Sequence, residues 1–465
     1  MRSLTLERPA PVAEATSVGW APLLVVLAGT FVTFLDFFIV NVALPSIETD
    51  LHAGPSALSL VVAGYGLTFA VGMITGGRLG DLYGRRRMFC IGLALFTLTS
   101  AACGVAPSAG FLITARLLQG AAGAMLTPQV LAIIGTTYVG KQRATAFAAY
   151  GFAMGIAGVL GQLLGGALIQ ADVAGVGWRA IFLINVPVGL VALGVARRFV
   201  PESRGSRARL DLVGTVLVTA AFTAVVLPLV EGREHGWPLW TWVSLVLAPV
   251  LAATFVGHQR TRVAPLVDLG LFGQRAFAVG TLVGMAFSFV PGAFFFVLAL
   301  YLQQGRGYSA LFSGVVFAAV GAGYFAAMMI AGGLAGRMRH QVLALGAILV
   351  AAGAVLLALE AYASSSLALV PGLALIGFGI GLVLVPLSSI VLADVDPLHA
   401  GSAAGVLATA QQVGGAFGIA VIGVVFFSIG SVTHAFVITV CVIAGMTALT
   451  AALSQVLPSR RQLSR

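Results

Sequence analysis

The sequence predicts an all-helical membrane protein with fourteen spans, arranged as two six-helix bundles plus two inserted helices. Three observations support this fold class: an extreme apolar composition, a succession of long apolar runs, and a basic segment that recurs in the second half. Hydrophobic residues make up 59% of the 465 residues and charged residues only 9%, and the mean hydropathy is +1.05. These values exclude an ordinary water-soluble protein.

The apolar runs have the length that a bilayer requires, because a helix needs about 20 residues to cross the hydrocarbon core. Clusters of Gly, Pro and charged residues divide the chain into fourteen such runs. Their expected extents are 20–43, 56–77, 88–105, 109–134, 146–170, 179–199, 211–231, 238–257, 276–303, 309–335, 340–361, 365–392, 400–428 and 432–456.

Positive charge is distributed unequally between the two sides of this arrangement. The net charge is +10, and with the N-terminus in the cytoplasm 21 of the 25 Lys and Arg residues fall on the cytoplasmic side. Arg179, Arg233 and Arg306 fall outside, and Arg116 falls within a span. Cytoplasmic loops carry such an excess of positive charge, so we expect both termini in the cytoplasm. Because the charge sits in short turns rather than on one face, nucleic-acid binding is not predicted.

The densest basic segment is Gly77–Arg87, with the sequence GRLGDLYGRRR, which we expect to form a tight cytoplasmic turn at Gly77 and Gly84. The stretch that starts at Gly76 is echoed 256 residues later by GGLAGRMRH, from Gly332. A weak repeat of this kind predicts two related halves. The expected organisation is a cytoplasmic tail at 1–18, a six-helix bundle at 19–199, two inserted helices with basic linkers at 200–275, a second six-helix bundle at 276–456 and a cytoplasmic tail at 457–465.

Two charges lie within the predicted spans, Asp36 in the first and Arg116 in the fourth. Both lie about 10 Å from the outer end of their span, at a rise of about 1.5 Å per residue, so they can pair. An unpaired charge at the bilayer centre costs about 2.5–3.5 kcal/mol on insertion scales, so each side chain is expected to face a partner or a polar cavity. A structural ion pair and a site that binds and releases protons both fit this pattern.

Amide side chains within the spans are candidates for a substrate cavity. Gln119 shares a helical face with Arg116, Asn41 lies near the outer end of the first span, and Gln162 lies inside the fifth. Gln411 and Gln412 are adjacent near the middle of the thirteenth span. A buried amide needs hydrogen-bond partners, which either a substrate or a neighbouring helix can supply.

Four segments together resemble the motifs of a known family. They are LDFFIVNVALP from Leu35, GRLGDLYGRRR from Gly77, RLLQGAAGAMLTP from Arg116 and GIAGVLGQLLGG from Gly155. In this order they are similar to the motifs of the major facilitator superfamily, in its fourteen-helix drug:proton antiporter branch. The resemblance covers nearly the whole chain and implies the major facilitator fold.

The resemblance also implies roles for particular residues. It assigns proton coupling to Asp36 and Arg116. It also implies that Asp81 and Arg85 hold the cytoplasmic ends of the bundles together in one conformational state. The expected cytoplasmic gate comprises Gly77, Asp81, Gly84, Arg85 and Arg86. The glycines that match the antiporter motif are Gly158, Gly161, Gly165 and Gly166.

Three positions depart from the motifs of the family. Phe38 stands where Thr is usual, Leu82 where a basic residue is usual, and Gln162 where Pro follows the motif glycine. Gln162 removes an expected helix kink and places an amide in the span. This departure keeps a transporter without antiport open as an alternative.

The predicted function is proton-coupled export of amphipathic small molecules, as in drug or antibiotic efflux, across a bacterial plasma membrane by alternating access. A proton-coupled or facilitative transporter of a specific metabolite is the alternative. No cofactor or metal is expected, and without a GxxxxGK[ST] phosphate-binding loop the proton gradient is the expected energy source. An enzyme is not predicted, because no His or Cys cluster occurs, and a sensor would need a soluble output domain. The expected partners are the small-molecule substrate, protons and the lipid bilayer, and we expect a monomer.

Overall fold

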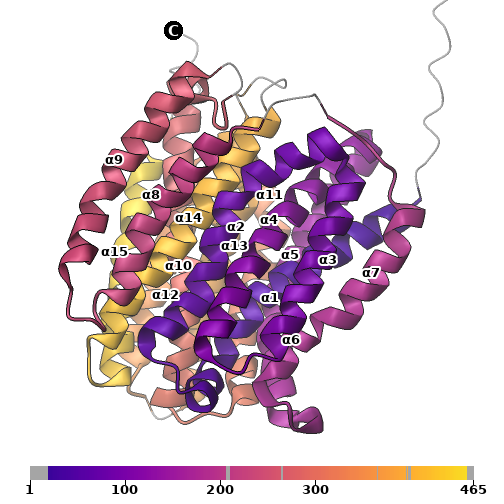
Figure 1. Cartoon of the computed structure of the whole chain (residues 1–465). Helices are drawn as coiled ribbons and strands as arrows, with labels where there is room; N and C mark the ends of the chain where they lie inside the picture. The colour runs from indigo at the N-terminus through magenta and orange to yellow at the C-terminus, as the bar shows by residue number, and fades with distance from the viewer. Residues whose placement is uncertain are drawn as a thin grey trace, which may run out of the picture.

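The computed structural model describes residues 19–205, 210–262, 265–363, 365–393, 395 and 400–457. The expected tail at 1–18, the expected tail at 457–465 except for Leu457, and part of each basic linker lie outside these residues. The elements in chain order are α1 (Ala21–Leu51), α2 (Pro55–Tyr83), α3 (Arg85–Gly104), α4 (Ala109–Thr137), α5 (Gly140–Ala171), η1 (Val173–Gly175), η2 (Gly177–Arg179), α6 (Ala180–Leu183), α7 (Asn185–Phe199), α8 (Leu212–Glu231), α9 (Leu239–Thr261), η3 (Leu269–Gly273), α10 (Arg275–Leu300), η4 (Tyr301–Gly305), α11 (Ala310–Met338), α12 (Gln341–Glu360), η5 (Ser366–Ala368), α13 (Leu369–Val391), α14 (Ala400–Phe427) and α15 (Val432–Ser454) (Figure 1).

Fourteen helical segments of the described chain are long and apolar enough to cross a membrane, so the predicted number of spans is confirmed. The sixth span, Gly177–Phe199, consists of η2, α6 and α7 with a break at Ile184. The ninth span, Arg275–Gly305, consists of α10 and a terminal π-helical turn, η4. Several helices begin at a polar residue whose side chain accepts a backbone N–H of the first turn. These N-caps are Ser108, Asp211, Ser309 and Ser431.

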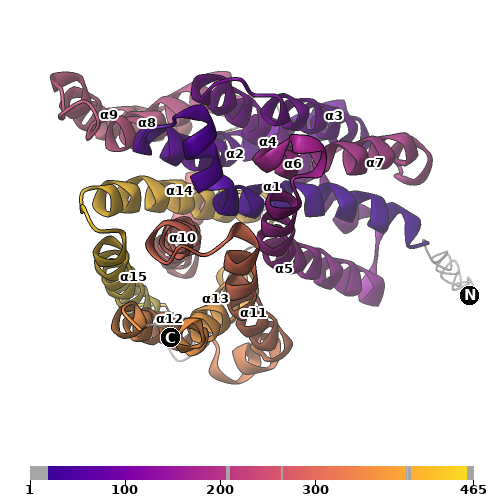
Figure 2. The same ribbon diagram turned by 90° about the horizontal axis from the view of Figure 1, so that it is seen from below.

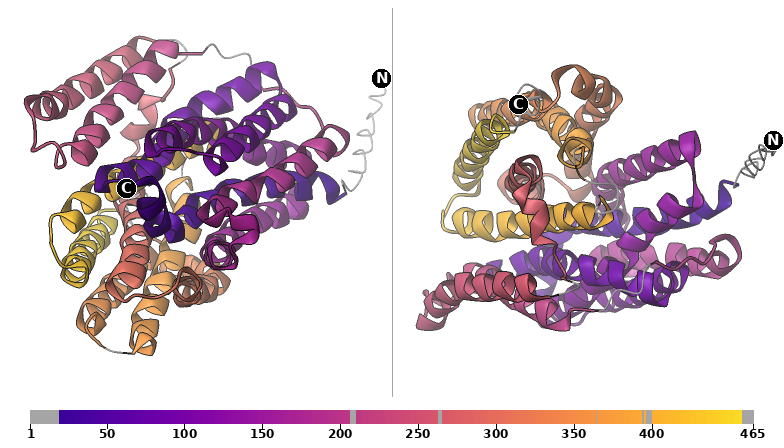
Figure 3. Two further views of the ribbon diagram at one scale, coloured as in Figure 1. Left: turned by 60° about the horizontal axis from the view of Figure 1, so that its bottom comes forward. Right: turned by 90° about the horizontal axis from the view of Figure 1, so that it is seen from above.

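The helices before α8 and those after α9 pack in the same pattern, as the predicted repeat requires. α4 packs against α2 and α3 as α13 packs against α11 and α12, and α1 packs on α5 as α10 packs on α14. Figures 2 and 3 show the early helices, in indigo to magenta, on one side of the molecule and the late helices, in orange to yellow, on the other. The two bundles meet through α2 with α14 and through α5 with α11.

The inserted helices α8 and α9 lie at one edge of the molecule, beside α2 and α14 (Figures 1 and 2). α8 packs against both α2 and α14, one helix from each bundle. α9 packs mainly on α8 and leaves most of its apolar side chains, such as Leu239 and Val246, exposed. In a bilayer these side chains suit contact with lipid.

The two ends of the bundles differ in charge and are called the basic end and the opposite end. The basic end holds the start of α1 and the junction of α2 with α3, where Arg85–Arg87 lie, and the opposite end holds the junction of α1 with α2. The expected tight turn at the basic end is wrong in part. Gly77 lies inside α2, which continues without a break to Tyr83. Gly84 alone, with a φ of 105°, separates α2 from α3, and this left-handed region favours glycine.

The closest backbone contacts that glycines allow between the bundles, among the described residues, lie at the opposite end and the middle of the helices. A Cβ on Gly166 of α5 would lie 2.4 Å from the carbonyl oxygen of Ala310, and one on Gly314 of α11 would lie 2.6 Å from that of Gln162. Nearer the basic end, a Cβ on Gly151 of α5 or on Gly332 of α11 would meet nothing within 4 Å. At these glycines the two bundles are packed more tightly towards the opposite end than towards the basic end.

Candidate functional site

The centre of the candidate site is an ion pair inside the N-terminal bundle. Nη1 of Arg116, on α4, bonds Oδ2 of Asp36, on α1, and both side chains have no exposed surface. The pairing that equal depth made possible is thus confirmed. Each partner of such a buried pair depends on the other, because removal of one leaves an uncompensated charge and typically costs about 3–5 kcal/mol of stability.

Amide groups complete the hydrogen bonding of the carboxylate. Nε2 of Gln119 and Nδ2 of Asn185 each donate to Oδ1 of Asp36 at 2.9 Å. Oε1 of Gln119 accepts from Nη1 of Arg116 at 2.8 Å, and Nε of Arg116 donates to the carbonyl oxygen of Val61 at 3.1 Å. Gln119 is fully buried in this cluster. It therefore bonds the ion pair instead of lining an open cavity.

Aromatic rings form the apolar walls around the guanidinium. The Cζ atom of Arg116 lies 4.2 Å from the centre of the Tyr65 ring and 5.6 Å from that of Phe182. Such cation–π contacts stabilise a desolvated cation by about 1–2 kcal/mol. Within the described residues, Nη2 of Arg116 has no hydrogen-bond partner, so this face of the cation relies on the rings.

Asn41 and Gln162 share one acceptor. Nδ2 of Asn41 donates to the carbonyl oxygen of Phe38 at 3.0 Å, and Nε2 of Gln162 donates to the same oxygen at 2.9 Å. Both side chains are 2% exposed. In this conformation they tie α1 to itself and to α5, and their oxygens have no hydrogen-bond partner among the described residues.

The antiporter-motif glycines let α5 approach its neighbours. A Cβ on Gly158, Gly161 or Gly165 would meet Leu35, Phe38 or Ile39 of α1 within 3.3 Å. Gly166 instead faces α11 of the other bundle. The motif therefore serves two interfaces, one within the N-terminal bundle and one between the bundles.

Gln411 and Gln412 lie on α14, far along the chain from the ion pair, and both are half-buried. A Cβ on Gly284 of α10 would lie 3.6 Å from Cγ of Gln411, so Gln411 packs along α10 inside the C-terminal bundle. The structure does not bring these amides into the Asp36 cluster. Their contact with substrate stays a prediction.

The expected gate residues contact one another and the chain that follows α7. Arg85 bonds Asp81 at 2.9 Å within the same segment, and the N–H of Arg86 donates to Glu202 at 3.0 Å. Arg78 donates to the carbonyl oxygen of Pro265 at 2.8 Å. None of these contacts reaches the C-terminal bundle.

The opposite end is held closed by contacts between the bundles. Nε2 of Gln303, in η4, donates to the carbonyl oxygen of Val42 on α1 at 2.8 Å, and Gln304 bonds Glu48. Below them the Phe38 and Phe295 rings meet edge to face at 5.4 Å. Sequence reasoning missed Gln303 and Gln304, although two amides at the end of an apolar run are a visible signal.

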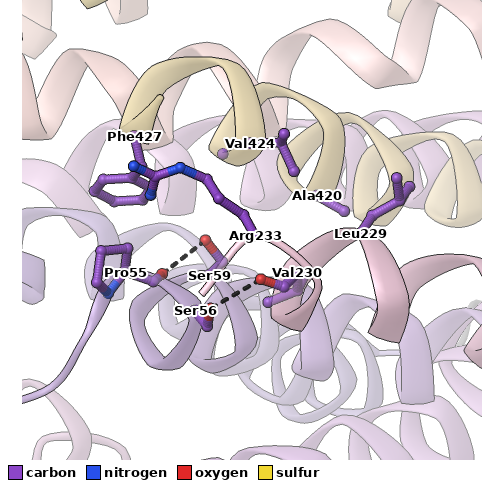
Figure 4. Close-up of a pocket in the computed structure, with 10 residues that line it drawn as sticks. Pro55, Ser56, Ser59, Leu229, Val230, Arg233, Ala420, Val424 and Phe427 are labelled. Carbon is purple, nitrogen blue, oxygen red and sulfur yellow. Dashed lines mark hydrogen bonds between the residues drawn. The ribbon is translucent and has the colours of Figure 1, made fainter. Parts of the chain in front are cut away.

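The inserted pair contributes to the same closure. A narrow pocket at the opposite end lies between α2, α8 and α14, and Ser56 Oγ donates there to the carbonyl oxygen of Val230 at 2.8 Å (Figure 4). Figure 4 shows Arg233 extending towards Phe427 of α14.

At the basic end, Asp211 accepts from His258 at 2.8 Å and from Gln259 at 2.8 Å. Burial raises the pKa of the Asp211 carboxyl, but bonds from His258, the Gly214 N–H and Gln259 outweigh it and hold that pKa below its usual value.

In the described part of the chain, no group of three or more His, Cys, Asp or Glu side chains is placed to hold a metal ion. Sequence reasoning also missed Asn185, which completes the carboxylate's hydrogen bonds. Its signal was a single amide two residues before Pro187 in an otherwise apolar run.

Comparisons with known proteins agree with this geometry. Residues 26–419 match the model of the Major Facilitator Superfamily. The chain is 37% identical to a probable actinorhodin transporter of Streptomyces coelicolor, over 92% of this chain and 77% of that protein. It is 35% identical to the puromycin resistance protein pur8 of Streptomyces alboniger, over 95% and 92%. The fold matches the xylose transporter XylE from E. coli with a TM-score of 0.67 at 15% identity, covering 96% of this chain and 99% of that chain.

The family model covers most of the chain and the relatives align over nearly all of it. The two related bundles, the intramembrane ion pair and the glycine-lined contacts of α5 agree with the resemblance found in the motifs. This protein belongs to the Major Facilitator Superfamily.

Proposed function

We propose that this protein exports amphipathic small molecules, such as an antibiotic or another drug, from the cytoplasm in exchange for external protons. The observation that carries the proposal is the buried Asp36–Arg116 pair, which combines one titratable group with a fixed cation inside the membrane. Relatives that align over most of the chain are named as a transporter of actinorhodin and as a puromycin resistance protein. These names support export of a small organic molecule.

The orientation follows from the distribution of charge. The positive-inside rule favours a cytoplasmic basic end, so in this proposal the end that Gln303 and Phe295 hold against α1 faces outward and the described structure is an inward-facing state. Substrate enters from the cytoplasm between the bundles while Gln303 and Phe295 close the outer side against α1. The bundles then rock about the contacts of α5 with α11 and of α2 with α14.

Protonation of Asp36 drives the cycle in this proposal. In the outward-open state a proton from outside neutralises the carboxylate and converts the ion pair into a hydrogen bond between Arg116 and a neutral acid. The bundles return, the proton leaves to the cytoplasm, and Arg116 again faces a charged partner. The inward proton gradient supplies the free energy, and no cofactor is required.

The test uses proteoliposomes loaded with a fluorescent amphipathic dye and an imposed pH gradient. Asp36→Asn is expected to abolish proton-driven transport, whereas Asp172→Asn, an exposed acid at the end of α5, serves as the matched control and keeps it. Normal proton-driven transport by Asp36→Asn would exclude this residue as the carrier. Uptake of the dye in the direction opposite to export would instead favour an importer.

A further inference from the structure

We propose that Asn185 is a positioning residue for the neutral form of Asp36. When Asp36 is protonated, the side-chain amide of Asn185 turns over and its oxygen accepts a hydrogen bond from the O–H of the carboxylic acid. This inference rests on the proposed function, because it concerns the same proton site. Asn185 lies at the start of α7, directly after the break at Ile184, and is 1% exposed. Its Nδ2 donates to Asp36 Oδ1 at 2.9 Å and to Ser100 Oγ at 3.0 Å.

The helix break is what brings this amide to the carboxylate. Pro187 has no N–H, so the backbone cannot form a regular helical hydrogen bond at this turn. Ser100 Oγ donates to the carbonyl oxygen of Phe182, one turn earlier, at 2.9 Å. The break is thus fixed by a side chain from α3, and Asn185 is held against Asp36.

The observed hydrogen bonds suit only the charged carboxylate. Asp36 accepts from Arg116, Gln119 and Asn185, and in this arrangement each of these neighbours presents an N–H. A neutral carboxylic acid must donate its own hydrogen, and a buried donor left without an acceptor costs its full desolvation penalty. The protonated state therefore needs an acceptor that the observed arrangement does not present.

Asn185 holds the acceptor that is available. Its Oδ1 is buried and has no hydrogen-bond partner among the described residues. Oε1 of Gln119 already accepts from Arg116 and from the Cys103 thiol. The Tyr65 hydroxyl points to the carbonyl oxygen of Thr33 at 3.3 Å. These three side chains, Arg116, Tyr65 and Cys103, are the charged or titratable groups that face Asp36, from α4, α2 and α3.

Rotation of the amide by half a turn exchanges its two polar atoms. The amide oxygen of Asn185 then accepts a hydrogen bond from the new O–H group at Oδ1 of Asp36. The Ser100 hydroxyl turns away from Phe182 and donates to the same amide oxygen. The added proton comes from water at the open side, and no other covalent bond changes. Gln119 still donates to Oδ1 of Asp36 and Arg116 to Oδ2. One amide atom of Asn185 stays unpartnered in either orientation. In the turned orientation the bond of Ser100 to the Phe182 carbonyl oxygen is replaced by a bond of Ser100 to Asn185, so that carbonyl loses this partner.

Infrared difference spectroscopy on the purified full-length protein tests the exchange directly. Asp36→Asn identifies the C=O band of the protonated Asp36. In Asn185→Leu, which keeps the size of the side chain, the acid loses its acceptor, and that band is expected to move to higher frequency. Gln129→Leu is the matched control, because Gln129 is a buried amide that bonds the carbonyl oxygen of Gly76 in the same bundle. An unmoved band in Asn185→Leu would overturn the inference.

A second measurement uses the pH dependence of transport. In Asn185→Leu the carboxylate loses one of its three donors, which alone would raise the midpoint, but the acid loses its only free acceptor. A buried donor without an acceptor costs its full desolvation penalty, so the midpoint is expected to fall by about one pH unit, a tenfold change in proton concentration. If this variant does not fold, Asn185→Thr, whose hydroxyl can donate and accept, is compared with Asn185→Val, which has the same shape. Only the Val variant is expected to shift. Equal midpoints for Thr, Val and wild type would overturn the inference while leaving the role of Asp36, tested by Asp36→Asn, intact.

Discussion

Gln162 and Phe38, two positions at which this chain departs from the family's motifs, contact each other. The side-chain amide of Gln162 on α5 donates to the main-chain carbonyl of Phe38 on α1 at 2.9 Å. The Phe38 ring also packs over Gly158 and meets Phe295 of the other bundle. The amide that replaces the motif proline therefore bonds α5 to the turn of α1 that contacts the C-terminal bundle.

This relationship predicts the effect of restoring the proline. Gln162→Pro removes one helical hydrogen bond and the bond to Phe38, so we expect destabilisation of about 3 kcal/mol from the helix and about 1 kcal/mol from the lost side-chain bond. Thermal unfolding in detergent measures it. Gln162→Leu separates the two effects, because it loses only the side-chain bond. Equal melting temperatures for Pro and Leu variants would contradict a continuous α5.

Gly166 lets the backbone of α5 come close to that of α11, so Gly166→Ala should hinder closure of the opposite end. The added methyl group would lie 2.4 Å from the Ala310 carbonyl oxygen, and overpacking of this kind costs about 1–3 kcal/mol. We expect transport to fall by about tenfold. Gly151→Ala, on the same face of α5 with nothing within 4 Å, is the control and should transport normally. A similar loss in both variants would point to helix α5 itself rather than to the interface.

Gln303 is expected to stabilise the closed opposite end. Gln303→Ala removes its bond to the Val42 carbonyl, and the loss of about 1 kcal/mol should shift the conformational equilibrium about fivefold towards opening. Spin labels on Thr49 and Gly430, which are exposed at this end on different bundles, report the shift as longer distances. Gln274→Ala, at the other end of α10, should leave the distance distribution unchanged. An unchanged distribution in Gln303→Ala would mean that this bond does not hold the end closed.

The fold was predictable from the sequence because its signals are additive along the chain. Fourteen apolar runs and the echo of Gly77–Arg87 near Gly332 each depend on local composition, and the described structure confirms the number of spans. The pairing of Asp36 with Arg116 was also predictable, since equal depth and the cost of an unpaired charge leave few partners. These predictions needed only helix geometry and the thickness of a bilayer.

Other features depend on contacts that no linear pattern contains. Gln119 was a candidate for the cavity, but its position beside Arg116 places it in the buried cluster. Asn185 reaches Asp36 only because the sixth span breaks before Pro187. The turn expected at Gly77 does not form, because a single glycine inside a helix costs only about 1 kcal/mol and α2 continues past it to Tyr83.

Acid is expected to loosen the inserted helices through Asp211. The pKa of this carboxyl is lowered in the folded protein, so its bonds contribute stability above the ordinary pKa of an aspartate, and this contribution is lost as pH falls through the lowered value. Hydrogen exchange at the start of α8 should therefore quicken at acidic pH. Asp211→Asn should show faster exchange already at neutral pH and less change with acid. Identical pH profiles for the two proteins would exclude Asp211 as the group responsible.

The ion pair itself predicts a non-additive pair of substitutions. Arg116→Gln leaves Asp36 buried without its cation and should destabilise the protein by about 3–5 kcal/mol. The double variant Asp36→Asn with Arg116→Gln has no buried charge, so it should recover a large part of that stability, a coupling that a double-mutant cycle measures by thermal unfolding. Proton-driven transport should stay absent in the double variant, because no titratable group remains at the site. Additive losses of stability would mean that Asp36 is neutral in this conformation and that Arg116 is held by Gln119, Val61 and the aromatic rings alone.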